Sequence, residues 1–149
     1  MFQPYQDLLT AFAEEIGLEP EALLVTEEVV IDGLPVGLQL EGQDDDAEVL
    51  LCSLLAVPSP ERWTETARLL LQANHLWSGT CGATLGMLPD DDMISLSMRR
   101  PLRDLTADSL AVLVAKAADI GIAWQELIVE RESADAAPAF FDAVAPLRA

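Results

Sequence analysis

The chain has 149 residues, of which 51% are apolar, so it is long enough to bury the core of one ordinary domain without disulfides or metal. A formal net charge of -18 gives a surface that repels phosphate backbones and anionic lipids, which argues against nucleic-acid binding. No stretch has the roughly 18 uninterrupted apolar residues of a membrane helix, and no basic leader precedes an apolar run, so we expect a cytoplasmic protein without membrane insertion.

An amphipathic helix opens the chain, and strands follow it. Pro4 suits a first helical turn, and apolar residues recur at helical spacing from there to Gly17. The segment 23–31, rich in Val and Ile and followed by Asp32-Gly33, predicts a first strand and a hairpin turn. Apolar and polar residues alternate over 34–40, which predicts a half-buried second strand.

A third strand and a second helix form the middle of the chain. The apolar run 49–57 predicts a deeply buried strand. Ser59 is suited to cap a helix with Pro60 in its first turn, and this helix should run to about Leu76 or Trp77. We expect Gly79 to take the positive φ that closes a helix C-terminus.

Two further strands and a third helix complete the predicted fold. The glycine-flanked segment 82–86 and the alternating segment 94–99 predict the strands, and Thr106 is suited to cap the helix. The order α-β-β-β-α-β-β-α predicts an α+β fold with a twisted, mainly antiparallel sheet and three helices. We expect one domain over 1–132, followed by a flexible Ala- and Pro-containing tail over 133–149.

Residues that usually carry catalysis are scarce. His75 is the only histidine, so Ser-His-Asp and multi-histidine zinc arrangements fail, and its spacing from Cys81 is no known nucleophile signature. The aspartate runs 44–46 and 90–92 lack the ligand spacing of a calcium loop, and the glycines of 79–86 lack the P-loop lysine. We therefore expect no catalytic residue, no metal site and no cofactor, and two cysteines that are reduced packing residues.

The segment 69–87 carries a family resemblance. It reads LLLQANHLWSGTCGATLGM, a helix ending Leu-Leu-x-Ala-Asn-x-x-Trp before a glycine turn and Gly-Ala-Thr-Leu-Gly. This pattern resembles the type III secretion effector chaperones of the Tir-chaperone (CesT-like, class I) family. The rest of the chain from about Pro4 to Leu127 fits by size, acidity and element order. The abundance of apolar surface in so short a chain also favours a dimer or a bound client.

The resemblance implies an acidic, cytoplasmic bacterial homodimer that works without ATP. Such a protein binds the N-terminal chaperone-binding region of a secreted effector in extended form, keeps it soluble and secretion-competent, and helps deliver it to the secretion apparatus. The resemblance places the dimer contact on the second helix and the next strand, at Leu69, Leu70, Ala73, Trp77, Leu85 and Met87. It places effector binding on the first helix and first three strands, at Leu8, Phe12, Ile16, Val29, Ile31, Val36 and Leu38.

Two alternatives stay open at this point. A small acidic enzyme would need a convergent set of titratable groups, which the scarcity of His, Cys and Lys argues against. A non-enzymatic regulatory or scaffold module of similar fold fits the same composition. Co-purification of a disordered effector segment distinguishes a chaperone from such a module, and turnover of a small substrate that depends on His75 would favour the enzyme.

Overall fold

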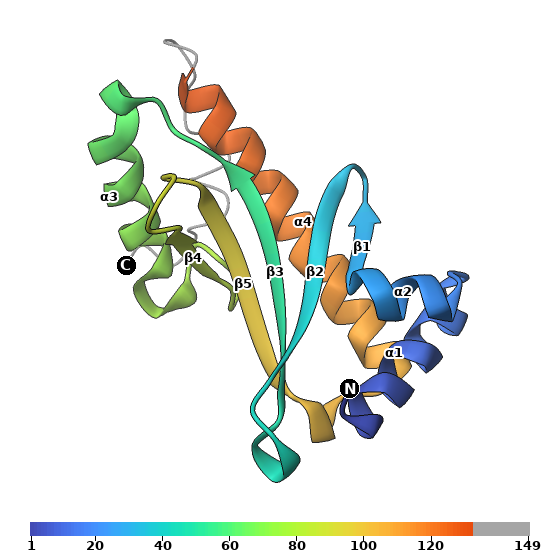
Figure 1. Cartoon of the computed structure of the whole chain (residues 1–149). Helices are drawn as coiled ribbons and strands as arrows, with labels where there is room; N and C mark the ends of the chain where they lie inside the picture. Colours follow the sequence, from blue (N-terminus) through green and yellow to red (C-terminus); the bar gives the residue numbers. More distant parts are fainter. Residues whose placement is uncertain (133–149) are drawn as a thin grey trace. The chain divides into compact units, whose positions relative to one another are not determined.

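The computed structural model describes residues 1–132, and the predicted tail, 133–149, lies outside them. The chain divides into two compact units, each built from two stretches of sequence. Unit 1 comprises residues 1–52 and 98–118, and unit 2 comprises residues 53–97 and, among the described residues, 119–132. The strands form one five-stranded sheet in the order β1-β2-β3-β5-β4, which confirms the α+β class (Figure 1).

Unit 1 begins with the predicted amphipathic helix, α1 (Gln3–Ile16). Pro4 lies in its first turn, where a missing N–H costs nothing. Gly17 closes the helix at φ 77°, and its N–H donates to the carbonyls of Ala13 and Glu14. The buried face is the one that the spacing predicts, formed by Tyr5, Leu8, Leu9, Phe12 and Ala13.

The first strand is shorter than predicted, because a helix takes up part of its sequence. Residues Pro20–Thr26 form α2, and β1 covers only Glu28–Ile31. Pro20 supplies the fixed φ of a first helical turn, and Glu21 lies near the positive end of the helix. The predicted strand over 23–31 is therefore wrong in its first half. The described chain has four α-helices instead of three, in the order α-α-β-β-β-α-β-β-α.

The next two strands follow the sequence pattern. Asp32 (φ 50°) and Gly33 (φ 84°) make a two-residue turn with positive φ at both positions, as a type I′ hairpin requires. β2 (Leu34–Glu41) is buried at alternate residues and pairs antiparallel with both β1 and β3 (Glu48–Ala56). The short 3-10 helix η1 (Asp44–Asp46) connects β2 to β3.

Two of the remaining elements, β5 (Ile94–Pro101) and α4 (Ala107–Glu132), contribute residues to both units. The 3-10 helix η4 (Leu102–Asp104) between them belongs to unit 1. The predicted cap of α4 is confirmed, because the Ser109 N–H donates to the Thr106 hydroxyl at 3.2 Å and the Thr106 N–H donates to the Ser109 hydroxyl at 2.8 Å.

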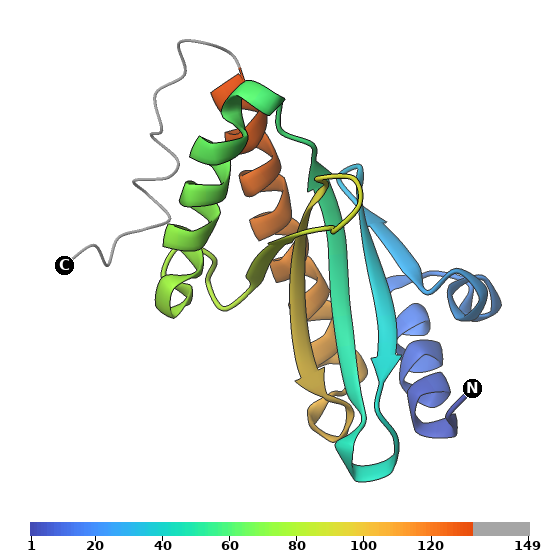
Figure 2. The same cartoon turned by 60° about the vertical axis from the view of Figure 1, so that its left-hand side comes forward.

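Unit 2 contains the segment that carries the family resemblance. The 3-10 helix η2 (Pro60–Arg62) leads into α3 (Trp63–Asn74), and a 3-10 turn, η3 (His75–Trp77), ends it. The chain then turns back into β4 (Thr84–Met87), which pairs antiparallel with β5 (Figure 2).

Gly79 does not close the helix with a positive φ, contrary to the sequence-based expectation. Leu76 and Trp77 take the left-handed conformation instead, at φ 51° and 53°. Gly79 is required for close approach, because a Cβ there would lie 2.9 Å from Cα and Cβ of Ala73. The Gly79 carbonyl also accepts a hydrogen bond from the buried Trp124 indole at 3.1 Å, which fixes the turn against α4.

The asparagine at the end of α3, Asn74, forms two hydrogen bonds to the main chain of β4. Its side-chain amide donates to the Leu85 carbonyl at 2.8 Å, and its side-chain oxygen accepts the Leu85 N–H at 2.9 Å. Asn74 thus satisfies both main-chain groups of a residue in β4, as a neighbouring strand would. This pair of bonds fixes the strand to the helix that precedes it.

We predict that Asn74→Ala lowers the free energy of unfolding by about 2–3 kcal/mol, because both Leu85 main-chain groups lose their partner in a part-buried setting. Urea unfolding measures the change. The matched control is Gln72→Ala at an exposed position of the same helix, which should cost no more than about 0.5 kcal/mol. Equal losses from the two variants would contradict this role of Asn74.

Candidate binding surfaces

Most of the residues predicted to bind an effector form the core of unit 1. Val36 and Phe12 are 0% exposed, and Leu8, Val29 and Leu38 are also buried. Ile31 is half-buried and Ile16 is 37% exposed. In this conformation most of the seven predicted residues therefore lie beneath the surface and are not accessible to an effector.

A groove beside the edge of the sheet offers apolar surface in the same unit. It has a volume of about 340 Å³, at the small end of the roughly 300–1,000 Å³ of ligand pockets. Its walls are α2 and β1, which lie next to each other in Figure 1. This α2–β1 groove is lined by Leu18, Glu19, Ala22, Leu23, Thr26, Glu28, Val29 and Val30.

The main chain of β1 has one unpaired edge, since β1 is the outermost strand on its side of the sheet. The Leu38 N–H donates to the Glu27 carbonyl at 2.7 Å, so by alternation Val29 and Ile31 also pair with β2. The N–H and C=O groups of Glu28 and Val30 therefore point away from β2. Consistently, the residue opposite Val30 is Pro35, which has no N–H to donate.

The outward groups are almost free of internal partners. The Glu28 carbonyl meets only the Thr26 hydroxyl, at 3.5 Å, which is long for an O–H···O bond. The side chain of Val30 is 60% exposed. An unpaired strand edge next to an apolar groove is the arrangement that binds extended peptides by strand addition.

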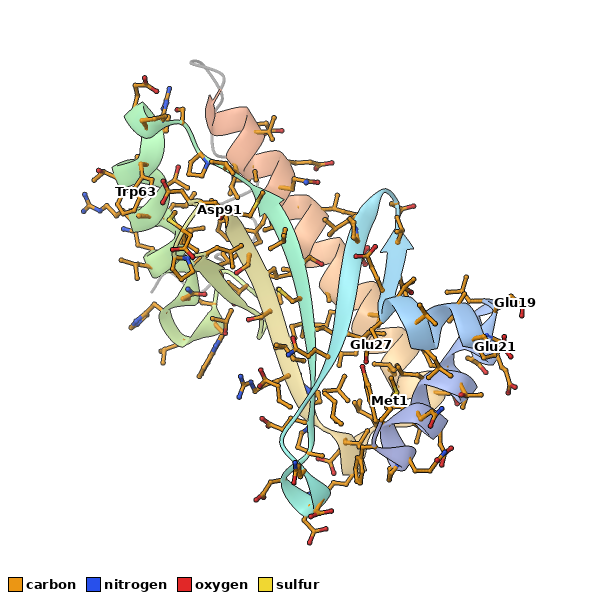
Figure 3. The ribbon with its side chains drawn as sticks, in the orientation of Figure 1. Met1, Glu19, Glu21, Glu27, Trp63 and Asp91 are labelled. Atoms are coloured by element: carbon orange, nitrogen blue, oxygen red, sulfur yellow. The ribbon has the colours of Figure 1, made fainter. Side chains whose placement is uncertain are left out.

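Glu27 sets the angle between α2 and β1. It takes the left-handed conformation (φ 48°, ψ 35°), its N–H donates to the Leu23 carbonyl, and its C=O accepts from β2. Figure 3 labels it at the end of α2 opposite to Glu19 and Glu21. This conformation is unfavourable for a non-glycine residue, and the hydrogen bonds that Glu27 makes to α2 and β2 stabilise it.

Tyr5 lies against this junction from α1. Its side chain is 1% exposed, and its hydroxyl makes no hydrogen bond within the described residues. Burial, and secondarily the negative charge of Glu27, raises the pKa of Tyr5 above its ordinary value of 10.0. The phenol is therefore held neutral beside Glu27.

Most of the residues predicted to form the dimer contact are also buried within one chain. Leu69, Leu70, Ala73 and Leu85 are each no more than 6% exposed, and Met87 is half-buried. Trp77, at 56% exposed, lies at the surface. Substituting an aspartate for Leu70 or Leu85 would therefore unfold unit 2 whether or not the chain dimerises, and would not test the interface.

The same segment nevertheless exposes other large apolar side chains. Leu76 is 77% exposed, and its left-handed neighbour Trp77 is exposed with it. Leu71 is 73% exposed, and Trp63, labelled on α3 in Figure 3, is 40% exposed. These four residues, which we call the α3 surface, are Trp63, Leu71, Leu76 and Trp77. Large apolar side chains exposed in this number on α3 and the turn after it make this segment a candidate protein interaction site.

No arrangement for catalysis or metal binding is evident among the side chains that the structure describes, those of residues 1–130. His75 and Cys81 are both exposed, and the described residues hold no group of three or more side chains able to bind a metal ion. Both cysteines are free: Cys52 is half-buried, and burial raises the pKa of its thiol. Cys81 is exposed, so the prediction that it is a packing residue is wrong.

A second, polar pocket in unit 1 is lined by ion-paired and main-chain groups. Arg103 donates from Nη1 to the Asp45 carbonyl at 3.1 Å, and nearby Arg99 pairs with both Glu41 and Glu48. These contacts join the β2–β3 connection to β5 and η4.

None of the helices described here combines the length and the apolarity needed to cross a membrane.

The family model of the Tir chaperone protein (CesT) family matches residues 7–124, most of the chain. The chain belongs to this family. The resemblance carried by 69–87 is thereby confirmed, and the protein is of the type III secretion chaperone family. A comparison with curated protein sequences gave no match.

Three solved structures show the same fold. A chain of the HopA1–SchA chaperone–effector complex is 20% identical with a TM-score of 0.64, covering 83% of this chain and 94% of that one. A chain of the ExsC–ExsE complex is 21% identical with a TM-score of 0.69, covering 86% and 96%. A chain from the complex of the Yersinia pestis type III secretion chaperone SycH with a fragment of YscM2 is 21% identical with a TM-score of 0.53, covering 79% and 97%.

We predict that the single tyrosine of the chain titrates abnormally. In the folded protein the phenolate absorbance should appear only well above pH 10, and in concentrated urea it should appear near 10. Because the unfolded chain then loses the proton first, the contribution of Tyr5 to stability is full below about pH 10 and is lost as the pH rises beyond it.

Tyr5→Phe provides the control for this titration. It should remove that alkaline loss and leave the neutral-pH stability unchanged or higher, because the buried hydroxyl that it deletes has no hydrogen-bond partner. A phenol that titrates near 10 in the folded protein would contradict the burial of Tyr5 under the junction.

Proposed function

We propose that this chain is a type III secretion chaperone that binds the N-terminal chaperone-binding region of a secreted effector in extended form. As a cytoplasmic homodimer without a cofactor, it keeps the effector soluble and secretion-competent and helps deliver it to the secretion apparatus. The observation that carries the proposal is the unpaired outer edge of β1, where the main-chain groups of Glu28 and Val30 point away from β2 and both residues line the α2–β1 groove.

Membership of the family and the matched structures support the same assignment. The names of two of those structures describe a chaperone–effector complex and a type III secretion chaperone bound to a protein fragment. The client in our proposal adds a strand to β1 and places apolar side chains into the groove. Main-chain bonds then supply affinity, and the shape of the groove supplies selectivity.

The α3 surface is the contact that we propose for the homodimer. In this proposal Leu76 and Trp77 meet the partner directly. The buried Leu69, Leu70, Ala73 and Leu85 act beneath them, by holding α3 and β4 in position. The two left-handed residues would be stabilised by the area that they bury in the dimer.

We predict that Leu76→Asn gives a folded monomer. Asparagine tolerates the left-handed conformation better than leucine does, so the turn persists while an apolar side chain that is 77% exposed is removed. Sedimentation equilibrium measures the mass, and circular dichroism confirms the fold.

Val112→Gln is the matched control for this change. Val112 is an apolar residue of α4 that is 70% exposed and lies outside the α3 surface, so its replacement should leave the mass unchanged. An unaltered dimer from Leu76→Asn would remove the α3 surface from the interface.

We predict that Val30→Pro abolishes most client binding in a protein that stays folded. The outward N–H of Val30 is not needed by the sheet, and proline is tolerated at such edge positions. A client strand would lose that donor and meet the proline ring, which should weaken binding by about tenfold or more. Calorimetry with a co-expressed effector N-terminal segment measures the loss.

Val30→Thr keeps the main-chain donor and the branched shape, so it should bind within a few-fold of the wild type. If the Val30→Pro and Val30→Thr variants bind the client segment equally well, strand addition at β1 is excluded. A regulatory or scaffold module of the same fold would instead retain no disordered effector segment on purification.

A further inference from the structure

The first part of the chain has an unusual distribution of charge. Residues 1–61 contain 14 Asp and Glu side chains and no Lys, Arg or His. Eight of these acids fall within residues 1–33, which form α1, α2, β1 and the hairpin turn. A client that docks on these elements therefore meets negative charge only.

Two of the acids line the α2–β1 groove itself. Glu19 and Glu28 are exposed, and neither has a cationic partner among residues 1–130, whose side chains the structure describes. Elsewhere in unit 1 the situation differs, because Glu41 and Glu48 share the guanidinium of Arg99. The groove thus combines an apolar lining with carboxylates that none of the described cationic side chains neutralises.

The geometry of β1 fixes where a complementary charge would have to lie. Glu28 and Val30 are two residues apart, so their side chains point to the same face of the sheet. Their partners on β2 are Gly37 and Pro35, neither of which brings a charge. Side chains of an added strand that lie opposite Glu28 and Val30 are likewise two residues apart, whether that strand is parallel or antiparallel.

We propose that the effector segment bound at β1 carries an apolar residue opposite Val30 and, two positions away on the same face, a Lys or Arg opposite Glu28. The inference rests on the proposed function, since it assumes strand addition. It defines the client class as an extended segment in which one residue separates an apolar side chain from a basic one.

The two positions have different physical roles. The apolar side chain enters the groove and supplies the free energy of burial. The exposed ion pair adds little affinity, but an acidic residue at that position would oppose Glu28 directly and be rejected. The basic residue therefore acts mainly on selectivity and on the rate of encounter.

A randomised short-peptide library displayed on phage tests the inference. Clones are selected on the wild-type chaperone and screened against Val30→Pro, so that only those needing the edge of β1 are kept. They should be enriched in an apolar residue and a Lys or Arg separated by one position. Selection on Glu28→Lys should replace the basic residue by Asp or Glu at the same spacing.

Synthetic peptides from the enriched clones give the magnitude. Changing the basic residue to Gln should weaken binding to the wild type by about two- to fivefold and leave binding to Glu28→Gln unchanged. The matched control is Glu21→Lys, an exposed acid on α2 outside the groove lining, labelled beside Glu19 in Figure 3, which should not invert the preference.

The outcomes separate the inference from the function on which it rests. The inference is overturned, and strand addition is left intact, if the clones need Val30 but show no basic residue at this spacing. The same holds if selection on Glu28→Lys still enriches the basic residue. If the preference for a basic residue also inverts on Glu21→Lys, the selectivity comes from the overall negative potential and not from Glu28, and the inference is overturned. If no clone depends on Val30, strand addition itself fails, and the inference fails with it.

Discussion

The left-handed junction at Glu27 is the constraint on which the proposed client site depends. A single residue with positive φ ends α2, starts β1 and bonds through its main chain to both α2 and β2. Because the chain turns there without a loop, α2 stays against the edge of the sheet and leaves a groove between them. The buried Tyr5 packs against the junction from α1, so α1, α2 and β1 meet at Glu27.

The second surface arises from a comparable use of backbone conformation. α3 ends in Leu76 and Trp77, both left-handed, which turns two large apolar side chains outward. Asn74 and Gly79 hold the turn on its inner side, the first by bonding to Leu85 and the second by close contact with Ala73. Strain at a position that exposes apolar surface is expected where a partner later covers it.

Much of the fold could be predicted from the sequence, because its period-two and helical patterns are regular. β2, β3, β5, α1 and the cap of α4 follow those patterns closely. The helix α2 was missed because the Val and Ile of 25–31 suggest a strand, although Pro20 followed by Glu21 signals a helix start. That error also concealed the groove, since α2 forms one of its walls.

Surface exposure was predicted less well than the fold. An apolar side chain in a periodic pattern marks the buried face of an element, and for this reason Phe12, Val36 and Leu70 lie in the core. Surface positions such as Val30 and Leu76 break the pattern or lie at the end of an element. Pro35 and the Asp32-Gly33 turn did contain the missing information, because together they fix which groups of β1 face outward.

Hydrogen exchange at the β1 amides, measured by NMR with and without a bound effector N-terminal segment, tests the central claim most directly. The Val29 N–H is already paired with β2, so it should exchange slowly in both states. The Glu28 and Val30 amides should exchange fast in the free chaperone and become protected in the complex. If both of them stay fast when the chaperone is saturated with the effector segment, the client is not held at this edge, and the account is wrong.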